Sequence, residues 1–220
     1  MNKLNCKKKS CKDVFRAFLV ATACYAGVFE FPVIRPTWWV PNKLIPFSKA
    51  IGCKDHDQWV HFYEHDCQFE RIWNDPERYL PILKRFNGVI LPDFSVYRDM
   101  PFVMQLWNIY RSRAIGFWLQ ANGVKVIVNM RWGDRRTYRC CCDGAPMRCT
   151  IAVGSHGTLK DKDDRAHFEA GLAVVVKRLK PTAIVVYGSA PDSIFGKYRD
   201  MGICVVQFDP EIAEAHKDGK

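Results

Sequence analysis

Short runs of consecutive apolar residues, each ending in small or polar residues, recur along the chain. Four are especially clear, namely GVILPDFS at 88–95, VKVIVNMRWGD at 124–134, TIAVGSHG at 150–157 and AIVVYGSA at 183–190. Each run is short and rich in β-branched residues, as a strand covered on both faces is. Helical patterns separate several of the runs, and this alternation is typical of a parallel sheet.

Helices are predicted over about 75–86, 99–123 and 163–179, with a further one beginning near Asp192. Additional strands are predicted over 59–66 and 203–210, while four prolines exclude regular helix across 31–47. Arg111 and Arg113 are expected on a solvated or salt-bridged helix face. The pattern as a whole predicts an α/β fold with about six mostly parallel strands and flanking helices, as an open sheet or an incomplete (β/α) barrel.

The length of 220 residues fits one large domain. We expect a basic extension with a helix over 1–30, a single α/β domain over 31–210 and a polar tail over 211–220. The first 27 residues resemble a weak secretory signal, but Asp13 and Arg16 interrupt a short apolar run. An amphipathic helix from about Asp13 to Gly27 is the preferred interpretation, and it would pack inward Val14, Phe15, Phe18 and Leu19. No stretch approaches the ~18 apolar residues of a membrane span, so a cytoplasmic location is expected.

The net charge of +10 favours anionic partners such as nucleic acid or nucleotides. A basic run near the start accounts for much of the excess, and a solvated tail is the alternative interpretation for Lys3, Lys7, Lys8, Lys9 and Lys12. Trp38 and Trp39 are expected to anchor the proline-rich segment on the domain, with an exposed platform for bases as the alternative.

The ten cysteines are expected to be reduced thiols, because a chain with 48% hydrophobic residues does not need disulfides. The cluster Cys140, Cys141 and Cys142, with Cys149, invites a metal or a reactive-thiol interpretation, but matching C-x2-C pairs are absent. His61 and His65 lie about 13 Å apart if their segment is a strand, and they could then not share a metal. No residue is therefore assigned as a metal ligand.

Parallel sheets bind ligands outside the carboxyl ends of their strands, and the polar residues of this chain gather there. Asp93 or Asp134 is the candidate general base. Alternatively, these carboxylates hold Mg²⁺, which is the candidate cofactor. His156 is the candidate proton carrier. The alternative is structural, since such residues also cap helices and stabilise turns. The predicted substrate-binding residues are Arg131, Trp132, Gly154, Ser155, Gly157, Tyr187, Gly188 and Ser189, with the glycine-flanked turns holding a phosphate.

Two well-known catalytic loops are absent from the chain. The G-x4-G-K-[ST] spacing of a Walker A loop is missing. The G-x-S-x-G of a hydrolase nucleophile is missing too. No helix-turn-helix, zinc finger or RNA-binding aromatic motif stands out either.

Four sequence pieces carry a family resemblance, namely LPDFSVYRDMP, NMRWGD, VGSHGTLKD and VYGSAPDSIF. In this order and spacing they resemble a family of uncharacterised proteins encoded by bacteria, bacteriophages and other mobile elements. The resemblance covers roughly Pro32 to Phe208. It implies one compact intracellular domain, in the host cytoplasm if a phage encodes it, and it supplies no reaction, cofactor or catalytic residue.

Two functions follow as hypotheses. The first is an enzyme that acts on a nucleotide or another phosphorylated or anionic substrate at the strand ends. The alternative is a non-catalytic protein that binds nucleic acid or sequesters a nucleotide or host factor. Both would use the same phosphate turns, and the oligomeric state is left open.

Overall fold

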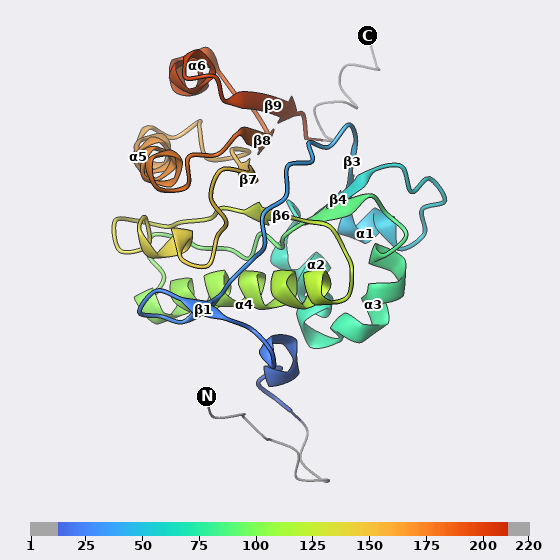
Figure 1. Ribbon diagram of the computed structural model, residues 1–220. Helices are drawn as coiled ribbons and strands as arrows, with labels where there is room; N and C mark the ends of the chain where they lie inside the picture. Colours follow the sequence, from blue (N-terminus) through green and yellow to red (C-terminus); the bar gives the residue numbers. More distant parts are fainter. Residues whose placement is uncertain (1–12, 211–220) are drawn as a thin grey trace.

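Seven parallel strands form the main sheet of the computed structural model, which describes residues 13–210 (Figure 1). The predicted basic run and polar tail lie outside the described residues. The order of the strands in the sheet is their order in the chain. They are β3 (Leu44–Pro46), β4 (Trp59–His61), β5 (Gly88–Ile90), β6 (Val126–Asn129), β7 (Thr150–Gly154), β8 (Ala183–Tyr187) and β9 (Cys204–Phe208).

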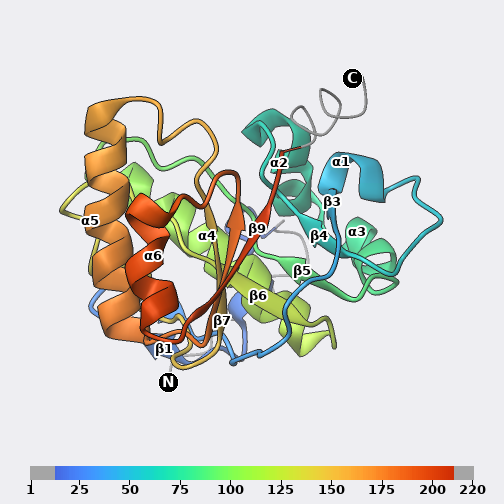
Figure 2. The same cartoon turned by 90° about the horizontal axis from the view of Figure 1, so that it is seen from above.

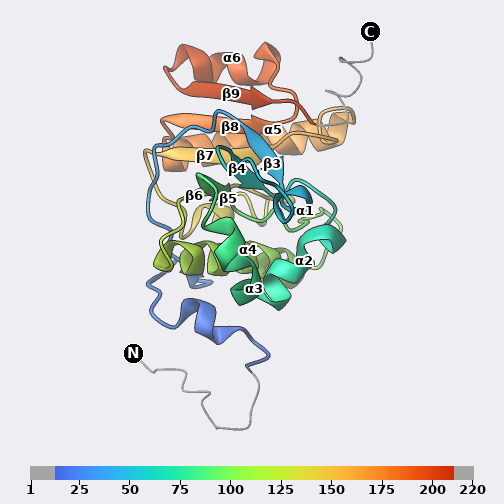
Figure 3. The same cartoon turned by 90° about the vertical axis from the view of Figure 1, so that its right-hand side faces the viewer.

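The sheet curls strongly. Strands β4 and β8 are four positions apart in the sheet, which would separate them by about 19 Å if the sheet were flat. The ring centroids of His61 on β4 and Tyr187 on β8 are nevertheless 4.6 Å apart. The sheet is therefore a half-barrel, and Figure 3 shows β3 and β4 turned in front of the other strands. This confirms the predicted α/β class in its incomplete-barrel form.

The concave face of the half-barrel has its own small apolar core. It is made by one residue from each of five neighbouring strands, namely Trp59, Ile90, Ile127, Ala152 and Val185. The largest of these is accommodated by a glycine, because a Cβ on Gly88 would lie 2.4 Å from the Trp59 ring. Polar side chains lie at the mouth of the half-barrel, at the carboxyl ends of the strands.

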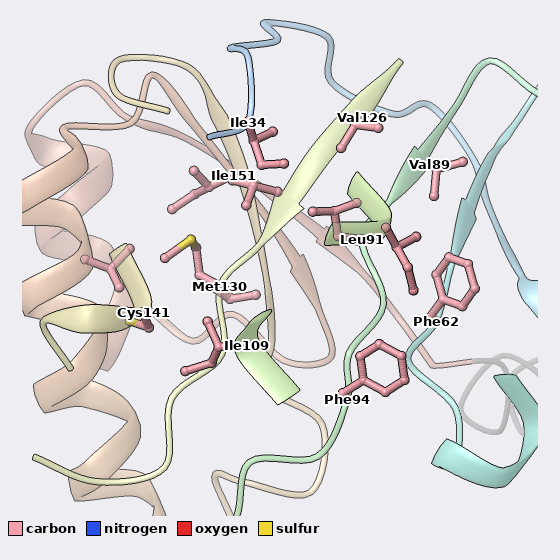
Figure 4. Packing of buried hydrophobic residues seen from close by; sticks show 14 of the residues in the cluster. Ile34, Phe62, Val89, Leu91, Phe94, Ile109, Val126, Met130, Cys141 and Ile151 are labelled. Atoms are coloured by element: carbon pink, nitrogen blue, oxygen red, sulfur yellow. The ribbon is translucent and has the colours of Figure 1, made fainter. Parts of the chain in front are cut away.

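The helices cover the convex face. Figure 2 shows α5 and α6 together on one side and α1, α2 and α3 on the other. Side chains such as Leu91, Ile109 and Met130 fill the space between sheet and helices (Figure 4). The helices are α1 (Phe47–Ala50), α2 (Asp66–Asn74), α3 (Pro76–Leu83), α4 (Phe102–Ala121), α5 (Lys162–Leu179) and α6 (Asp192–Asp200), with short 3₁₀ turns η1 (Ala17–Val20) and η2 (Cys140–Cys142). No helix within residues 13–210 is long and apolar enough to cross a membrane.

Two sequence patterns misled the prediction of strands. Strand β3 lies in the proline-rich segment, where Pro46 is tolerated because β3 is an edge strand and needs no N–H on its free side. The predicted strand 59–66 stops at His61, and Asp66 instead begins α2, where its carboxylate accepts two hydrogen bonds from Ser95.

The predicted helix from Asp13 to Gly27 is wrong. The segment forms η1 and then a hairpin of β1 (Tyr25–Ala26) and β2 (Phe31–Pro32). Arg16 and Gly27 have positive φ angles, which interrupt an α-helix at both ends of the segment. Leu19 is buried as expected, but Val14 and Phe15 are more than 70% exposed.

Candidate functional site

A chain of hydrogen bonds joins polar residues at the carboxyl ends of β4, β5 and β6. The Tyr63 hydroxyl donates to Asn129 Oδ1 at 3.0 Å, and Asn129 Nδ2 donates to Asp93 Oδ1 at 2.7 Å. Arg131 Nη1 lies 3.5 Å from Asp93 Oδ2. Asp93 keeps only 13% of its side chain exposed. The network fixes a carboxylate and a guanidinium side by side at the mouth of the half-barrel.

An aromatic stack lies directly below this network. The rings of Tyr63 and Tyr187 are stacked at 4.7 Å with an interplanar angle of 10°, and His61 packs against Tyr187. Burial raises the pKa of the Tyr63 hydroxyl well above its usual value, so this hydroxyl stays a hydrogen-bond donor. The stack closes the floor of the mouth and leaves the Tyr63 hydroxyl to orient Asn129.

Burial lowers the pKa of His61 to about 3, and its Nδ1 accepts a hydrogen bond from the Tyr63 amide. The pKa of this histidine is therefore about 6.5 in the unfolded chain, and between pH 6.5 and 3 the unfolded chain binds a proton that the folded protein does not bind. This contribution to stability is fully present above pH 6.5 and is lost as the pH falls toward 3. We expect the free energy of unfolding to depend on pH between 4 and 6 more steeply than in His61→Asn, by up to about 1.4 kcal/mol per pH unit. Urea unfolding across this range measures the slope, and His156→Asn, at an exposed histidine, should leave it unchanged.

A cleft of about 920 Å³ opens beside the network, between the ends of β5, β6 and β7 and the start of α5. Five of the predicted residues line it, namely Arg131, Trp132, Gly154, His156 and Gly157. Polar residues that sequence reasoning did not assign to the site also line it, among them His65, Arg98, Asp164 and His167. Arg98 and Asp164 form an ion pair at 2.7 Å across the cleft wall. The volume is within the range of small-molecule sites.

His167 is the best-oriented histidine of the cleft. Its Nδ1 lies 2.6 Å from the hydroxyl of the buried Tyr138, which fixes the ring. Asp164, His167 and Phe168 follow a helical i, i+3, i+4 spacing on α5, and all three line the cleft. That spacing, directly after the third strand-end turn, is the signal that could have identified His167 from the sequence.

Asp134 engages a different set of partners from Asp93. Its two carboxylate oxygens bind the Arg136 side chain, at 3.0 Å from Nε and 2.6 Å from Nη2. These hydrogen bonds lower the pKa of Asp134 to about 2. Within residues 13–210 no group of three or more His, Cys, Asp or Glu side chains is placed to hold a metal ion. The hydrogen bonds to Arg136 join the Asp134 carboxylate to a residue of its own loop.

The two glycine-flanked turns pack against each other. The amides of Ser155 and His156 donate to the Tyr187 carbonyl, and the Ser155 hydroxyl donates to the Ser189 carbonyl at 2.7 Å. A Cβ on Gly188, whose φ is +113°, would lie 2.6 Å from the His156 amide nitrogen and from the Ser155 hydroxyl oxygen. Most amide donors of these two turns thus already have partners, whereas the amides of Gly157 and Ser189 form no hydrogen bond with another backbone group within residues 13–210.

Trp132 reaches the cleft wall because Gly171 leaves room for it in α5. A Cβ on Gly171 would lie 2.1 Å from Trp132 Nε1, which donates to the His167 carbonyl. Gly171→Ala gains up to about 1 kcal/mol of helix propensity, but the displaced buried indole costs more. We expect a net loss of about 1 to 3 kcal/mol in the free energy of unfolding. Gly196→Ala in α6, where a Cβ meets its nearest neighbour at 3.6 Å, is the matched control and should not destabilise the protein.

The cysteine cluster is structural in its contacts. Cys140, Cys141, Cys142 and Cys149 are buried and free. Burial raises the pKa of the Cys140 thiol to about 11, which opposes thiolate chemistry at that residue, whereas a hydrogen bond with the Cys141 thiol lowers the pKa of Cys142. The Cys141 carbonyl accepts a hydrogen bond from Arg113. The described cysteines accordingly fit the expected reduced thiols.

Comparison with known proteins gives a family but no activity. A family model described as "Domain of unknown function (DUF4417)" matches residues 23–209. The Gene 1 protein of Mycobacterium phage D29 is 35% identical over 170 residues, covering 74% of this chain and 62% of that protein. The Gene 1 protein of Mycobacterium phage L5 is 36% identical over 167 residues, covering 74% and 72%. The chain thus spans less than two thirds of the D29 relative, and no solved structure matches it.

Proposed function

The chain belongs to the DUF4417 family, a domain of unknown function, and we propose that it is an enzyme acting on a nucleotide or another phosphorylated small molecule in the strand-end cleft. The observation that carries the proposal is Arg131. Its side chain lines the cleft and is 28% exposed, and its Nε is buried without a hydrogen-bond partner among the described residues. A partly exposed guanidinium at the wall of a cleft, with its ion-pair partner Asp93 3.5 Å away, suits a phosphate or carboxylate.

Acid–base chemistry in this proposal belongs to Asp93 and the cleft histidines. Asp93 is held by Asn129 on one side and Arg131 on the other, so it can accept a proton from a ligand bound to Arg131. His167, oriented by Tyr138, or the exposed His156 supplies a proton from the lining of the same cleft. Asp134 contributes by ordering the loop that follows Arg131, and the Gly157 amide is a further donor for an anion. The host cytoplasm is the compartment that fits a phage-related nucleotide enzyme.

Thermal unfolding of the full chain against a panel of nucleoside mono-, di- and triphosphates, with and without Mg²⁺, tests the binding step. A ligand at a hundredfold excess over its dissociation constant stabilises the native state by about 2.7 kcal/mol. We expect Arg131→Ala to weaken the binding of the stabilising nucleotide about 10- to 150-fold, the value of one lost charge-assisted hydrogen bond. Isothermal titration calorimetry measures this change.

Arg85→Ala is the matched control, because Arg85 is an exposed arginine after α3 and does not line the cleft. Equal affinities of Arg131→Ala and the parent protein would contradict the proposed site. Product analysis by chromatography then separates the two functional hypotheses. Turnover lost in Asp93→Asn with binding retained supports the enzyme, whereas binding without turnover in the parent protein supports a sequestering protein.

A further inference from the structure

Two tryptophans lie exposed at the opposite end of the strands from the cleft. Trp38 is 64% exposed and Trp39 is 58% exposed, so the expectation that they anchor the proline-rich segment by burial is wrong. The chain fixes them in place all the same. Trp38 Nε1 donates to the Arg148 carbonyl at 2.9 Å, and the neighbouring Thr37 carbonyl accepts from the Thr150 amide. Two hydrogen bonds thus tie the Trp38 ring and the backbone beside it to the start of β7, while both tryptophan rings stay exposed.

Three cations precede three adjacent strands beside these rings. Lys125 comes before β6, Arg148 before β7 and Lys180 before β8. The registers pair Val128 with Ile151 and Thr150 with Ala183, so the three cations lie nearly level across the sheet. The Arg148 amide also donates to the Leu179 carbonyl, next to Lys180. Neighbouring strands are about 4.8 Å apart, so the row spans roughly 10 Å.

The contacts join the cations to the rings. Lys125 Nζ lies 4.2 Å from the centroid of the Trp39 ring. The Arg148 and Lys180 side chains form no ion pair with any residue between 13 and 210. The row of positive charge is therefore not neutralised by the described part of the chain.

Arg148 and Lys180 both have an unusual backbone conformation. Their φ angles are +53° and +48°, in the left-handed region where glycine or asparagine is favoured. A long cation at such a position costs backbone energy that glycine would avoid. Retaining a cation at two such positions, side by side, points to a use for the charge.

We propose that the surface formed by Trp38, Trp39, Lys125, Arg148 and Lys180 binds single-stranded nucleic acid. Flat aromatic faces stack on unpaired bases of any sequence, and a row of cations follows the phosphates beside them. In duplex nucleic acid the bases stack on each other, so they are not available to stack on these tryptophan rings. The surface lies at the amino ends of the strands, so it is separate from the cleft and does not depend on the function proposed for it.

Fluorescence anisotropy of a fluorescein-labelled dT12 strand, titrated with the full chain at 50 to 300 mM KCl, tests this proposal. Three phosphate contacts predict a slope of about −2 in a plot of log binding constant against log salt. Trp38→Ala and Trp39→Ala should each weaken binding about 5- to 150-fold. Arg148→Asn and Lys180→Asn suit the left-handed backbone and should each lower the magnitude of the slope by about 0.7.

Trp107→Ala is the matched control, since Trp107 is a 43% exposed tryptophan on α4, and it should bind the strand as the parent does. Circular dichroism confirms that each variant is folded, and the two asparagine variants provide the test if a tryptophan variant is not. Three results would overturn the proposal. The first is no binding at 50 mM KCl, and the second is tighter binding of a 12-base-pair duplex than of dT12. The third is binding that is lost in a variant with Lys7, Lys8 and Lys9 all replaced by glutamine but is unchanged in Trp38→Ala and Trp39→Ala.

Discussion

Arg113→Ala is expected to lower the free energy of unfolding by about 3 to 5 kcal/mol, one of the two largest effects on stability that we predict. Arg113 lies in the middle of α4 and is 1% exposed. Its guanidinium donates to the Asn129 carbonyl at 3.1 Å and to the Cys141 carbonyl at 2.9 Å. Alanine would leave both buried carbonyls without this donor and would open a cavity of most of a side chain. Urea unfolding followed by circular dichroism measures the loss.

Two further variants separate the causes of that loss. Arg113→Met restores most of the volume but not the donors, so we expect an intermediate loss of stability. Arg85→Ala, at an exposed arginine, should change the free energy of unfolding by less than about 0.5 kcal/mol. A stability of Arg113→Ala within that small range would mean that the two carbonyls do not depend on the guanidinium.

Asn129→Asp is the second large effect, and we expect it to depend on pH. Asn129 is 2% exposed, and its amide donates to Asp93 at 2.7 Å. An aspartate there would place a second carboxylate against the first, and burial with a like charge raises the pKa of the introduced group. We expect a loss of about 3 to 5 kcal/mol at pH 8, since one buried charge would lack compensation.

The sign of the pH dependence follows from linkage. A folded-state pKa raised above the unfolded value means that the folded variant binds the proton more tightly than the unfolded chain. Its deficit relative to the parent protein should therefore be small near pH 4 and should grow as the pH rises through the raised pKa. Paired urea unfolding curves from pH 4 to 8 measure this difference. Asn74→Asp, at an exposed asparagine, is the control, and a deficit of Asn129→Asp independent of pH would contradict the expected repulsion.

The sequence predicted the strands that combine β-branched residues with a clear end. The runs at 88–95, 124–134, 150–157 and 183–190 each contain a strand of the half-barrel. It did not predict β3, because prolines argue against a strand unless the strand is known to lie at an edge. Edge position is a property of the assembled sheet and is not encoded locally.

Burial of charge was equally hard to predict. Arg111 and Arg113 are both expected on a solvated or salt-bridged helix face, and Arg111 pairs with Glu70. Arg113, two positions away, is enclosed by α4, β6 and the cysteine cluster, so the expectation of a solvated or salt-bridged face is wrong for it. Its partners are backbone carbonyls, and a backbone acceptor leaves no signature in the sequence.

The candidate site was predicted in outline. The rule that ligands bind at the carboxyl ends of parallel strands placed Arg131, Trp132 and His156 at the cleft that the structure contains. Sequence reasoning could not assign different roles to Asp93 and Asp134, because the loop geometry determines that Asp93 binds Asn129 and that Asp134 binds Arg136. Nor could it find the ring contact of His61 with Tyr187, which depends on the curl of the sheet.

The sequential order of the strands also has a consequence for synthesis of the chain on the ribosome. Each strand after β3 pairs with the strand that precedes it in the sequence, so every hydrogen-bonding partner of β3 through β6 has been made once Gly154 has been added. The stack of Tyr63 on Tyr187 is different, because it joins residues on either side of four strand-to-strand steps. A nascent chain that ends before β8 contains every carboxylate and guanidinium of the Asp93 network but lacks the ring that closes the floor beneath it. Completion of the mouth therefore waits until β8 has been translated.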